Sequence, residues 1–144
     1  DDFLVEIGGE LFASGRIKSD RQWQVAIEAP EADNRSIQTT LPLQDMAMAT
    51  SGDYRNYFEW NGKRYSHTID PRSGYPVDHQ LVSVTVIAAS AMYADGWATT
   101  ISVLGLEQGM QLANAQQLAV LAMIETASGL ETIRSEKLAA YTGY

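Results

Sequence analysis

The chain has 144 residues, a length that fits one domain with enough apolar side chains to form a core. Apolar residues make up 45% and charged residues 19% of it, which is an ordinary globular composition. The net charge of -8 argues against nucleic-acid binding, because an acidic surface is repelled by phosphate backbones. The absence of cysteine excludes disulfides and cysteine-based zinc sites.

The N-terminal part of the chain is predicted to form strands. Residues 3–12 are rich in β-forming side chains and are interrupted by Gly8 and Gly9. Two glycines inside a strand pattern are typical of a bulge or of a close approach to the backbone. Residues 23–29 alternate apolar and polar side chains, which predicts a half-buried strand, and residues 36–43 are a weaker strand candidate.

A β-hairpin is predicted in the middle of the chain. Residues 57–60 and 63–65 flank Asn61-Gly62, and such a dipeptide is the strongest short signal for a hairpin because a type I′ turn needs positive φ twice. The second strand of this hairpin leads directly to His67. We therefore expect His67 to lie at a strand end, where the scaffold fixes its position.

The C-terminal part is predicted to combine strands with a pair of helices. Its predicted elements are a strand at 81–89, helices at 91–104 and 106–115, a buried strand at 118–125 and a closing strand at 130–138. Ser90 is a suitable N-cap for the first helix, and Gly105 ends it. The fold class predicted is α+β, with mostly antiparallel strands and a helical pair inserted before the last hairpin.

The densest group of chemically useful side chains lies in residues 67–76. His67, Asp70 and Arg72 fall within six residues, and Pro71 and Gly74 restrict and shape the backbone between them. Such a rigid polar segment is typical of a loop that holds reactive or ligand-binding groups. The spacing alone is equally consistent with an ordinary turn that carries a surface histidine.

Asp95 and Thr99 form a second candidate, because residues i and i+4 share one face of a helix. Both offer the hard oxygen ligands that Mg²⁺ prefers, and both are placed in the first turns of the predicted helix, where anions are favoured. The alternative is that Asp95 is a helix-start charge and that Thr99 is a buried hydroxyl bonded back to a carbonyl. Taken alone, the pair favours this alternative.

Residues 49–54 form a third candidate, in which Thr50 and Ser51 lead into a predicted turn at Gly52-Asp53. Backbone of this kind can approach a phosphate or a ring, but the motif taken alone favours a plain turn. His79 has no partner visible in the sequence, and we interpret it as a surface residue.

Taken together and in this order, the motifs resemble those of the ApbE family of flavin transferases, the FAD:protein FMN transferases. The segments that carry the resemblance are Ile7-Gly8-Gly9-Glu10, Thr50-Ser51-Gly52-Asp53-Tyr54, His67 to Gly74, and Ala94-Asp95-Gly96-Trp97-Ala98-Thr99. The resemblance runs from Val5 to the last predicted strand. One departure is Ser73, which stands where threonine is usual in the family.

The resemblance implies an activity. Family members bind FAD and Mg²⁺, release AMP, and leave FMN on a threonine or serine hydroxyl of a target protein, typically a subunit of a membrane redox complex. Some relatives instead hydrolyse FAD to FMN and AMP. The open alternatives are therefore an Mg²⁺-dependent FAD pyrophosphatase and a non-catalytic flavin-binding module. A purely structural domain would require all four motif matches to be accidental.

The resemblance also implies site residues. Asp95 and Thr99 would hold Mg²⁺, and the backbone of Ile69 would line the FAD site. His67 would take the proton from the acceptor hydroxyl, since histidine exchanges protons near neutral pH. Asp70 would either orient that imidazole or help to organise the metal.

Two further expectations concern Arg72 and the extent of the chain. Arg72 would pair with a phosphate or brace the loop against a carboxylate, and we favour bracing. The strand-like pattern that begins almost at Asp1 indicates a cut inside a larger protein. The resemblance implies that residues 1–144 are a single domain from the C-terminal part of a larger flavin transferase. By resemblance, the preceding half would supply further FAD contacts, a metal contact and an N-terminal anchor at the periplasmic face of the inner membrane. The fragment alone is expected to bind FAD poorly.

Overall fold

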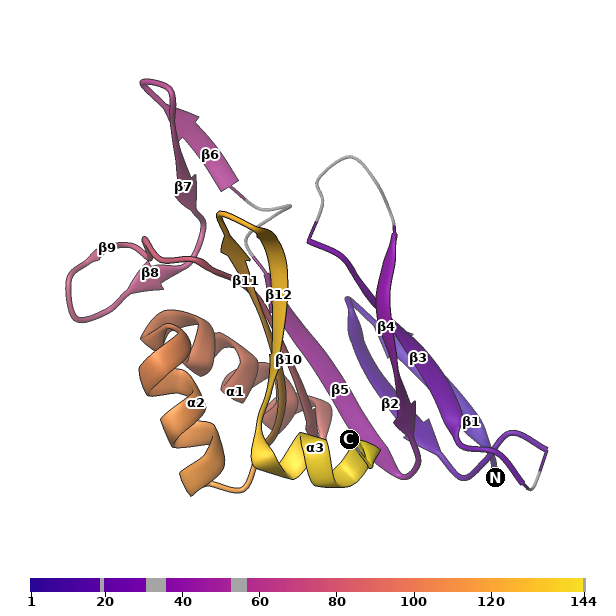
Figure 1. The fold of residues 1–144 in the computed structure, drawn as a ribbon. Coiled ribbons are helices and arrows are strands. Elements are labelled where there is room, and N and C mark those ends of the chain that lie inside the picture. Colours follow the sequence, from indigo (N-terminus) through magenta and orange to yellow (C-terminus); the bar gives the residue numbers. More distant parts are fainter. Residues whose placement is uncertain (19, 31–35, 53–56, 144) are drawn as a thin grey trace.

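The chain folds around one antiparallel sheet that is covered on both faces (Figure 1). The computed structural model describes residues 1–18, 20–30, 36–52 and 57–143. In chain order the elements are β1 (Phe3–Ile7), β2 (Glu10–Ser14), β3 (Trp23–Glu28), β4 (Ile37–Leu43), β5 (Met46–Gly52), β6 (Tyr57–Trp60), β7 (Lys63–Ser66), β8 (Ile69–Asp70), β9 (Tyr75–Pro76), β10 (Leu81–Ala88), α1 (Ala91–Leu104), α2 (Leu106–Ala115), β11 (Ala119–Thr126), β12 (Gly129–Arg134) and α3 (Glu136–Thr142). The strand order of the main sheet is β1-β2-β5-β10-β11-β12.

The neighbouring strands β10 and β11, which lie inside the sheet, bury both of their faces, and this explains their nearly continuous apolar sequences. On one face, Val84 and Val120 pack with Ile101 of α1 and with α2. On the other face, Leu121 packs with the β3–β4 ribbon and with Leu138 of α3. The α+β class and the helical pair before the last hairpin are therefore confirmed.

The helical pair follows the predicted boundaries. The Ser90 hydroxyl accepts a hydrogen bond from the backbone N–H of Tyr93 at 3.4 Å, as an N-cap does. Gly105 separates α1 from α2 with φ of +79°, a conformation that glycine adopts without steric cost. Its N–H donates to the carbonyl oxygen of Ile101 at 3.0 Å and closes the last turn of α1. No helix among the described residues is long and apolar enough to cross a membrane.

The interpretation of Gly8-Gly9 as a bulge was wrong. The two glycines form the turn of a hairpin, because Ile7 of β1 pairs directly with Glu10 of β2. Gly8 and Gly9 have φ of +69° and +110°, and a two-residue hairpin turn requires such values. The pair therefore ends a strand at the edge of the sheet instead of kinking one.

The closing strand predicted at 130–138 was also wrong in its second half. β12 ends at Arg134, and α3 begins after Ser135. The Ser135 hydroxyl accepts a hydrogen bond from the N–H of Leu138 at 3.2 Å and donates one to the carbonyl of Leu118 at 2.7 Å. This buried serine caps the helix and ties it to the start of β11, so the apolar pattern that continues to Leu138 belongs to a helix.

The predicted hairpin around Asn61-Gly62 is confirmed as β6 and β7. This ribbon and the short β8–β9 ribbon are separate from the main sheet and extend beyond it (Figure 1). The rings of Phe58 and Tyr65 stack across the first ribbon with centroids 5.2 Å apart. As predicted, the ribbon ends immediately before His67, since the last residue of β7 is Ser66.

Candidate functional site

His67 lies on the surface at the start of a tightly hydrogen-bonded loop. On one side of it, the Ser66 hydroxyl accepts a hydrogen bond from the N–H of Thr68 at 3.1 Å. The carbonyl of Thr68 in turn accepts from the N–H of Val77 at 3.0 Å, which joins the two ends of the loop. The backbone on both sides of His67 is therefore fixed by short-range bonds and by this closing contact.

The tip of the loop is a turn centred on Pro71 and Gly74. The carbonyl oxygen of Asp70 accepts hydrogen bonds from the N–H of Gly74 at 2.8 Å and of Ser73 at 3.2 Å. Gly74 has φ of +74°, so the positive φ expected there is present. Asp70 then pairs with Tyr75 in the β8–β9 ladder. The side chain of Ile69 is about half exposed, at 49%.

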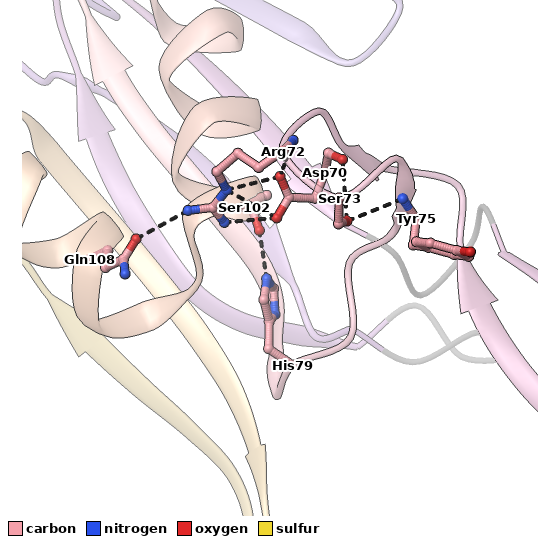
Figure 2. Close-up of polar contacts among 7 residues, drawn as sticks. All are labelled: Asp70, Arg72, Ser73, Tyr75, His79, Ser102 and Gln108. Carbon is pink, nitrogen blue, oxygen red and sulfur yellow. Dashed lines mark hydrogen bonds and ion pairs between the residues drawn. The ribbon is translucent and has the colours of Figure 1, made fainter.

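Asp70 and Arg72 form a two-point ion pair across this turn (Figure 2). Arg72 Nε donates to Asp70 Oδ1 at 2.9 Å, and Nη2 donates to Oδ2 at 2.8 Å. The N–H of Arg72 adds a third bond to Oδ1 at 2.9 Å. These hydrogen bonds hold the pKa of the Asp70 carboxyl below its ordinary value and raise the pKa of the Arg72 guanidinium. The bracing contact favoured for Arg72 is present.

Two side chains of the loop reach the junction of α1 and α2 (Figure 2). Arg72 Nη1 lies 3.4 Å from Gln108 Oε1, in the first turns of α2. His79 Nε2 lies 2.8 Å from the carbonyl oxygen of Ser102, in the last turn of α1. His79 is exposed, as expected, but it has a specific partner that the sequence did not reveal.

A small cleft brings the third candidate motif next to this loop. Its lining includes Ser51 and Gly52 of β5, Ser66 and Thr68 beside His67, and Ser102 of α1. Thr50, Ser51 and Gly52 are the last residues of strand β5, which ends where the turn was predicted to begin. Asp53 and Tyr54 lie outside the described residues. The end of β5, the His67 loop and the end of α1 thus meet in one place.

Asp95 and Thr99 both lie on the exposed side of α1. Asp95 is in the second turn of the helix. The favourable interaction of its negative charge with the helix dipole is therefore small, because it falls off within the first turn. The alternative that Thr99 is a buried hydroxyl bonded to the helix does not hold. The neighbouring Thr100 makes that bond instead, donating to the carbonyl of Gly96 at 2.7 Å.

The sequence and the fold of the chain are both similar to those of known proteins. The sequence model of the ApbE family matches residues 1–124 of the chain. The chain is 47% identical over 135 residues to a protein of Vibrio cholerae named FAD:protein FMN transferase, covering 94% of this chain and 40% of that protein. Its fold matches the crystal structure of apo flavinyl transferase ApbE from Pseudomonas stutzeri with a TM-score of 0.82 and 42% identity, covering 98% of this chain and 43% of that one.

The chain belongs to the ApbE family. A flavin transferase of Haemophilus influenzae shares 46% identity over 132 residues, covering 91% of this chain and 38% of that protein. The ApbE protein of Thermotoga maritima has the same fold with a TM-score of 0.83 at 29% identity, covering 98% of this chain and 45% of that one. The chain therefore spans about two fifths of the length of the relatives it matches.

Asp95 and Thr99 are exposed side chains on α1 that carry oxygen atoms of the kind that Mg²⁺ takes as ligands. A carboxylate and a hydroxyl spaced four residues apart supply two oxygen ligands, and Mg²⁺ usually combines one or two carboxylates with water and phosphate oxygens. Among the described residues, no group of three or more His, Asp or Glu side chains is placed to hold a metal ion. Asp95 and Thr99 alone therefore offer only two of the oxygen ligands that such an ion takes.

The contacts from Arg72 to Gln108 and from His79 to Ser102 were not predicted from the sequence. These partners lie 36 and 23 residues apart, so no local spacing rule connects them. Arg72 was considered as a brace, but only against a carboxylate. For the contact between His79 and Ser102, the only indication in the sequence was the presence of a histidine shortly after the His67 loop.

Proposed function

We propose that this chain carries part of the active site of an FAD:protein FMN transferase. The observation that carries the proposal is the convergence of a braced His67 loop, the end of β5 and helix α1 in a member of the ApbE family. A loop fixed by the bonds of Asp70 and Thr68 suits a reaction that depends on positioning. Transfer at a pyrophosphate is such a reaction, because it relies on alignment and charge stabilisation.

In this proposal, Asp95 and Thr99 are the residues that would hold Mg²⁺. When bound, the ion neutralises negative charge on the pyrophosphate of FAD. Both side chains are exposed on one face of α1, which leaves them accessible to a substrate. Because the net charge is -8, an anionic substrate needs a local exception such as a metal ion, an arginine or a helix N-terminus, and the ion would supply it here.

His67 is proposed to act as the general base. It removes the proton from a threonine or serine hydroxyl of the acceptor, whose oxygen forms a bond to the phosphorus of the FMN moiety. The bond from that phosphorus to the bridging oxygen breaks, and AMP leaves with that oxygen. An exposed imidazole at a fixed strand end is accessible to an acceptor protein.

Asp70 is proposed to support His67 through the turn. Its two carboxylate oxygens accept hydrogen bonds from Arg72, and its carbonyl accepts from Gly74. This favours a positioning role over direct metal binding. The backbone of Ile69, between His67 and Asp70, is proposed to line the FAD site, because it lies in the fixed part of the loop.

We further propose that the acceptor is a protein of a membrane redox complex and that the full-length protein works at the periplasmic face of the inner membrane. The family resemblance supports both proposals. Fractionation of cells expressing the full-length protein tests the location, with recovery in the membrane fraction and sensitivity to external protease as the expected result. Recovery in the cytosol would contradict it.

The proposed activity is tested by incubating the full-length protein with FAD, Mg²⁺ and a threonine-bearing acceptor peptide. Mass spectrometry should show the peptide with an added FMN, and a chelator should abolish that gain. Free FMN and AMP with an unmodified peptide would instead establish the FAD pyrophosphatase. Bound FAD without any product would indicate a flavin-binding module.

A further inference from the structure

The His67 loop is attached to the helical layer at two points, both beside Gly105. Arg72 reaches Gln108 on one side of Gly105, and His79 reaches the carbonyl of Ser102 on the other side (Figure 2). The contact of His79 is shorter, at 2.8 Å against 3.4 Å. A distance of 2.8 Å is typical of a well-formed hydrogen bond, whereas 3.4 Å is marginal. His79 is therefore the stronger of the two attachments.

The direction of the His79 contact follows from the chemistry of its partner. A carbonyl oxygen only accepts hydrogen bonds, so Nε2 of His79 carries the proton and donates it. The carbonyl of Ser102 is among the last four of α1, which have no partner within the helix. His79 thus satisfies an acceptor at the C-terminal end of the helix, a favourable place for a histidine.

The local packing gives the imidazole a defined place. A Cβ atom built on Gly105 would lie 3.2 Å from Cδ2 and 3.7 Å from Nε2 of His79. The ring therefore lies directly over the glycine that separates α1 from α2. A larger residue at position 105 would push the ring away from Ser102.

The contact is on the same side of α1 as the proposed magnesium ligands. Asp95, Thr99 and Ser102 follow the spacing i, i+4 and i+7, which places them along one stripe of a helix. A helix rises about 1.5 Å per residue, so Ser102 lies only about 10 Å along the axis from Asp95. His79 is also linked to the His67 loop along the chain. The N–H of Val77, two residues before His79, donates to the carbonyl of Thr68.

We propose that His79 is a positioning residue that sets the His67 loop against the helix carrying Asp95 and Thr99. The inference deepens the proposed function and rests on it for its catalytic consequence. A hydrogen bond between two rigid elements fixes the distance between the proton-accepting group and the metal ligands. Small displacements of such groups cost large factors in rate.

The test uses the full-length protein with His79→Leu, which removes the donor, and His79→Gln, whose amide nitrogen reaches a similar position. Gln80→Leu is the matched control, because Gln80 is the exposed neighbour and its backbone bond to Glu125 does not involve the side chain. His79→Leu should lower kcat for FMN transfer about tenfold, with KM for FAD changed less than about twofold. His79→Gln and Gln80→Leu should stay close to wild type. Equal kcat for wild type and His79→Leu, with only a lower melting temperature, would overturn the proposal.

Amide hydrogen exchange tests the positional claim separately from activity. In His79→Leu, exchange should become faster at both Gly105, which bonds to Ile101, and Val77, which bonds to Thr68. Faster exchange at Gly105 with Val77 unchanged would show that His79 only caps the helix, and would overturn the proposal. If wild type transfers no FMN, the proposed function fails, and the exchange result still decides whether His79 positions the loop.

Discussion

Arg72 donates two hydrogen bonds to the carboxylate of Asp70, two residues before it. Nε donates to Oδ1 at 2.9 Å, and Nη2 donates to Oδ2 at 2.8 Å. Arginine is suited to this role because its planar group matches both carboxylate oxygens at once. The pair is solvent-exposed on the arginine side, where 56% of the side chain is accessible. Its main effect is therefore to fix the shape of the loop, since exposed ion pairs add little to overall stability.

Arg72→Lys should loosen the turn although it keeps the charge, because lysine cannot bind both oxygens in the same plane. The pKa of Asp70, which Arg72 holds below its ordinary value, should rise toward that value in the variant. Since the pKa is lowered in the folded protein, the pair is intact at neutral pH and is lost as pH falls through the lowered value. NMR titration of the Asp70 carboxyl carbon measures this. An identical titration in wild type and variant would contradict the role assigned to Arg72.

Thr99→Val and Thr100→Val form a matched pair on α1. The Thr100 hydroxyl already donates to Gly96 within the helix, whereas Thr99 is proposed to face the metal. Thr99→Val should raise the Mg²⁺ concentration needed for half-maximal transfer about tenfold or more, and Thr100→Val should leave it nearly unchanged. A Mg²⁺ titration of the transfer rate separates the two. Equal shifts in both variants would argue against a metal ligand at position 99.

Asp95→Ala should abolish Mg²⁺-dependent transfer without unfolding the protein. Asp95 is an exposed side chain in the second turn of α1, and removing such a carboxylate usually changes stability by less than about 0.5 kcal/mol. Activity and thermal denaturation are measured on the same preparation. Full activity in the variant would favour the alternative in which Asp95 and Thr99 have only a structural role.

His67→Ala should retain FAD binding and slow the transfer by roughly 10²- to 10⁴-fold, the usual contribution of a general base. FAD binding is followed by the quenching of flavin fluorescence, and transfer is followed by mass. The control is His79→Gln, which retains a donor and is expected to remain active. Equal transfer rates for wild type and His67→Ala would remove His67 from the proposed mechanism.

Gly105→Ala and Gly96→Ala should change stability in opposite directions. Gly105 has φ of +79° and lies under the His79 ring, so alanine there should destabilise the fold by about 1 to 2 kcal/mol. Gly96 lies within α1, and a Cβ there would meet no atom within 4 Å. Alanine at position 96 should stabilise the helix by roughly 0.5 to 1 kcal/mol. Urea denaturation measures both, and a stabilised Gly105→Ala variant would contradict the strain assigned to that position.

The elements that the sequence predicts well are those with local signals at their ends. Ser90 and Gly105 mark the ends of α1, and Asn61-Gly62 marks the turn between β6 and β7. Strand β5 was not predicted, because its small residues, such as Ala47 and Ala49, have little preference for strands. Its place comes from pairing with β2 and β10, which is a property of the whole sheet.

In the candidate site too, features set by neighbouring residues were predicted, and contacts between residues far apart in the sequence were not. The positions of His67 at a strand end and of Asp95 and Thr99 on one helix face follow from spacing within short segments. The attachment of His79 to Ser102 joins residues on opposite sides of strand β10 in the sequence. Only the folded arrangement, with α1 packed against the sheet, brings these residues together.

The ratio of AMP released to FMN bound on the acceptor separates transfer to a protein hydroxyl from hydrolysis of FAD. The full-length protein is incubated with FAD, Mg²⁺ and the threonine-bearing peptide, and AMP and flavinylated peptide are quantified in the same samples. We expect equal amounts of the two products, and no AMP when the peptide is omitted or its threonine is replaced by valine. AMP released at the same rate without an acceptor hydroxyl, together with free FMN, would rule out transfer to a protein and identify water as the acceptor.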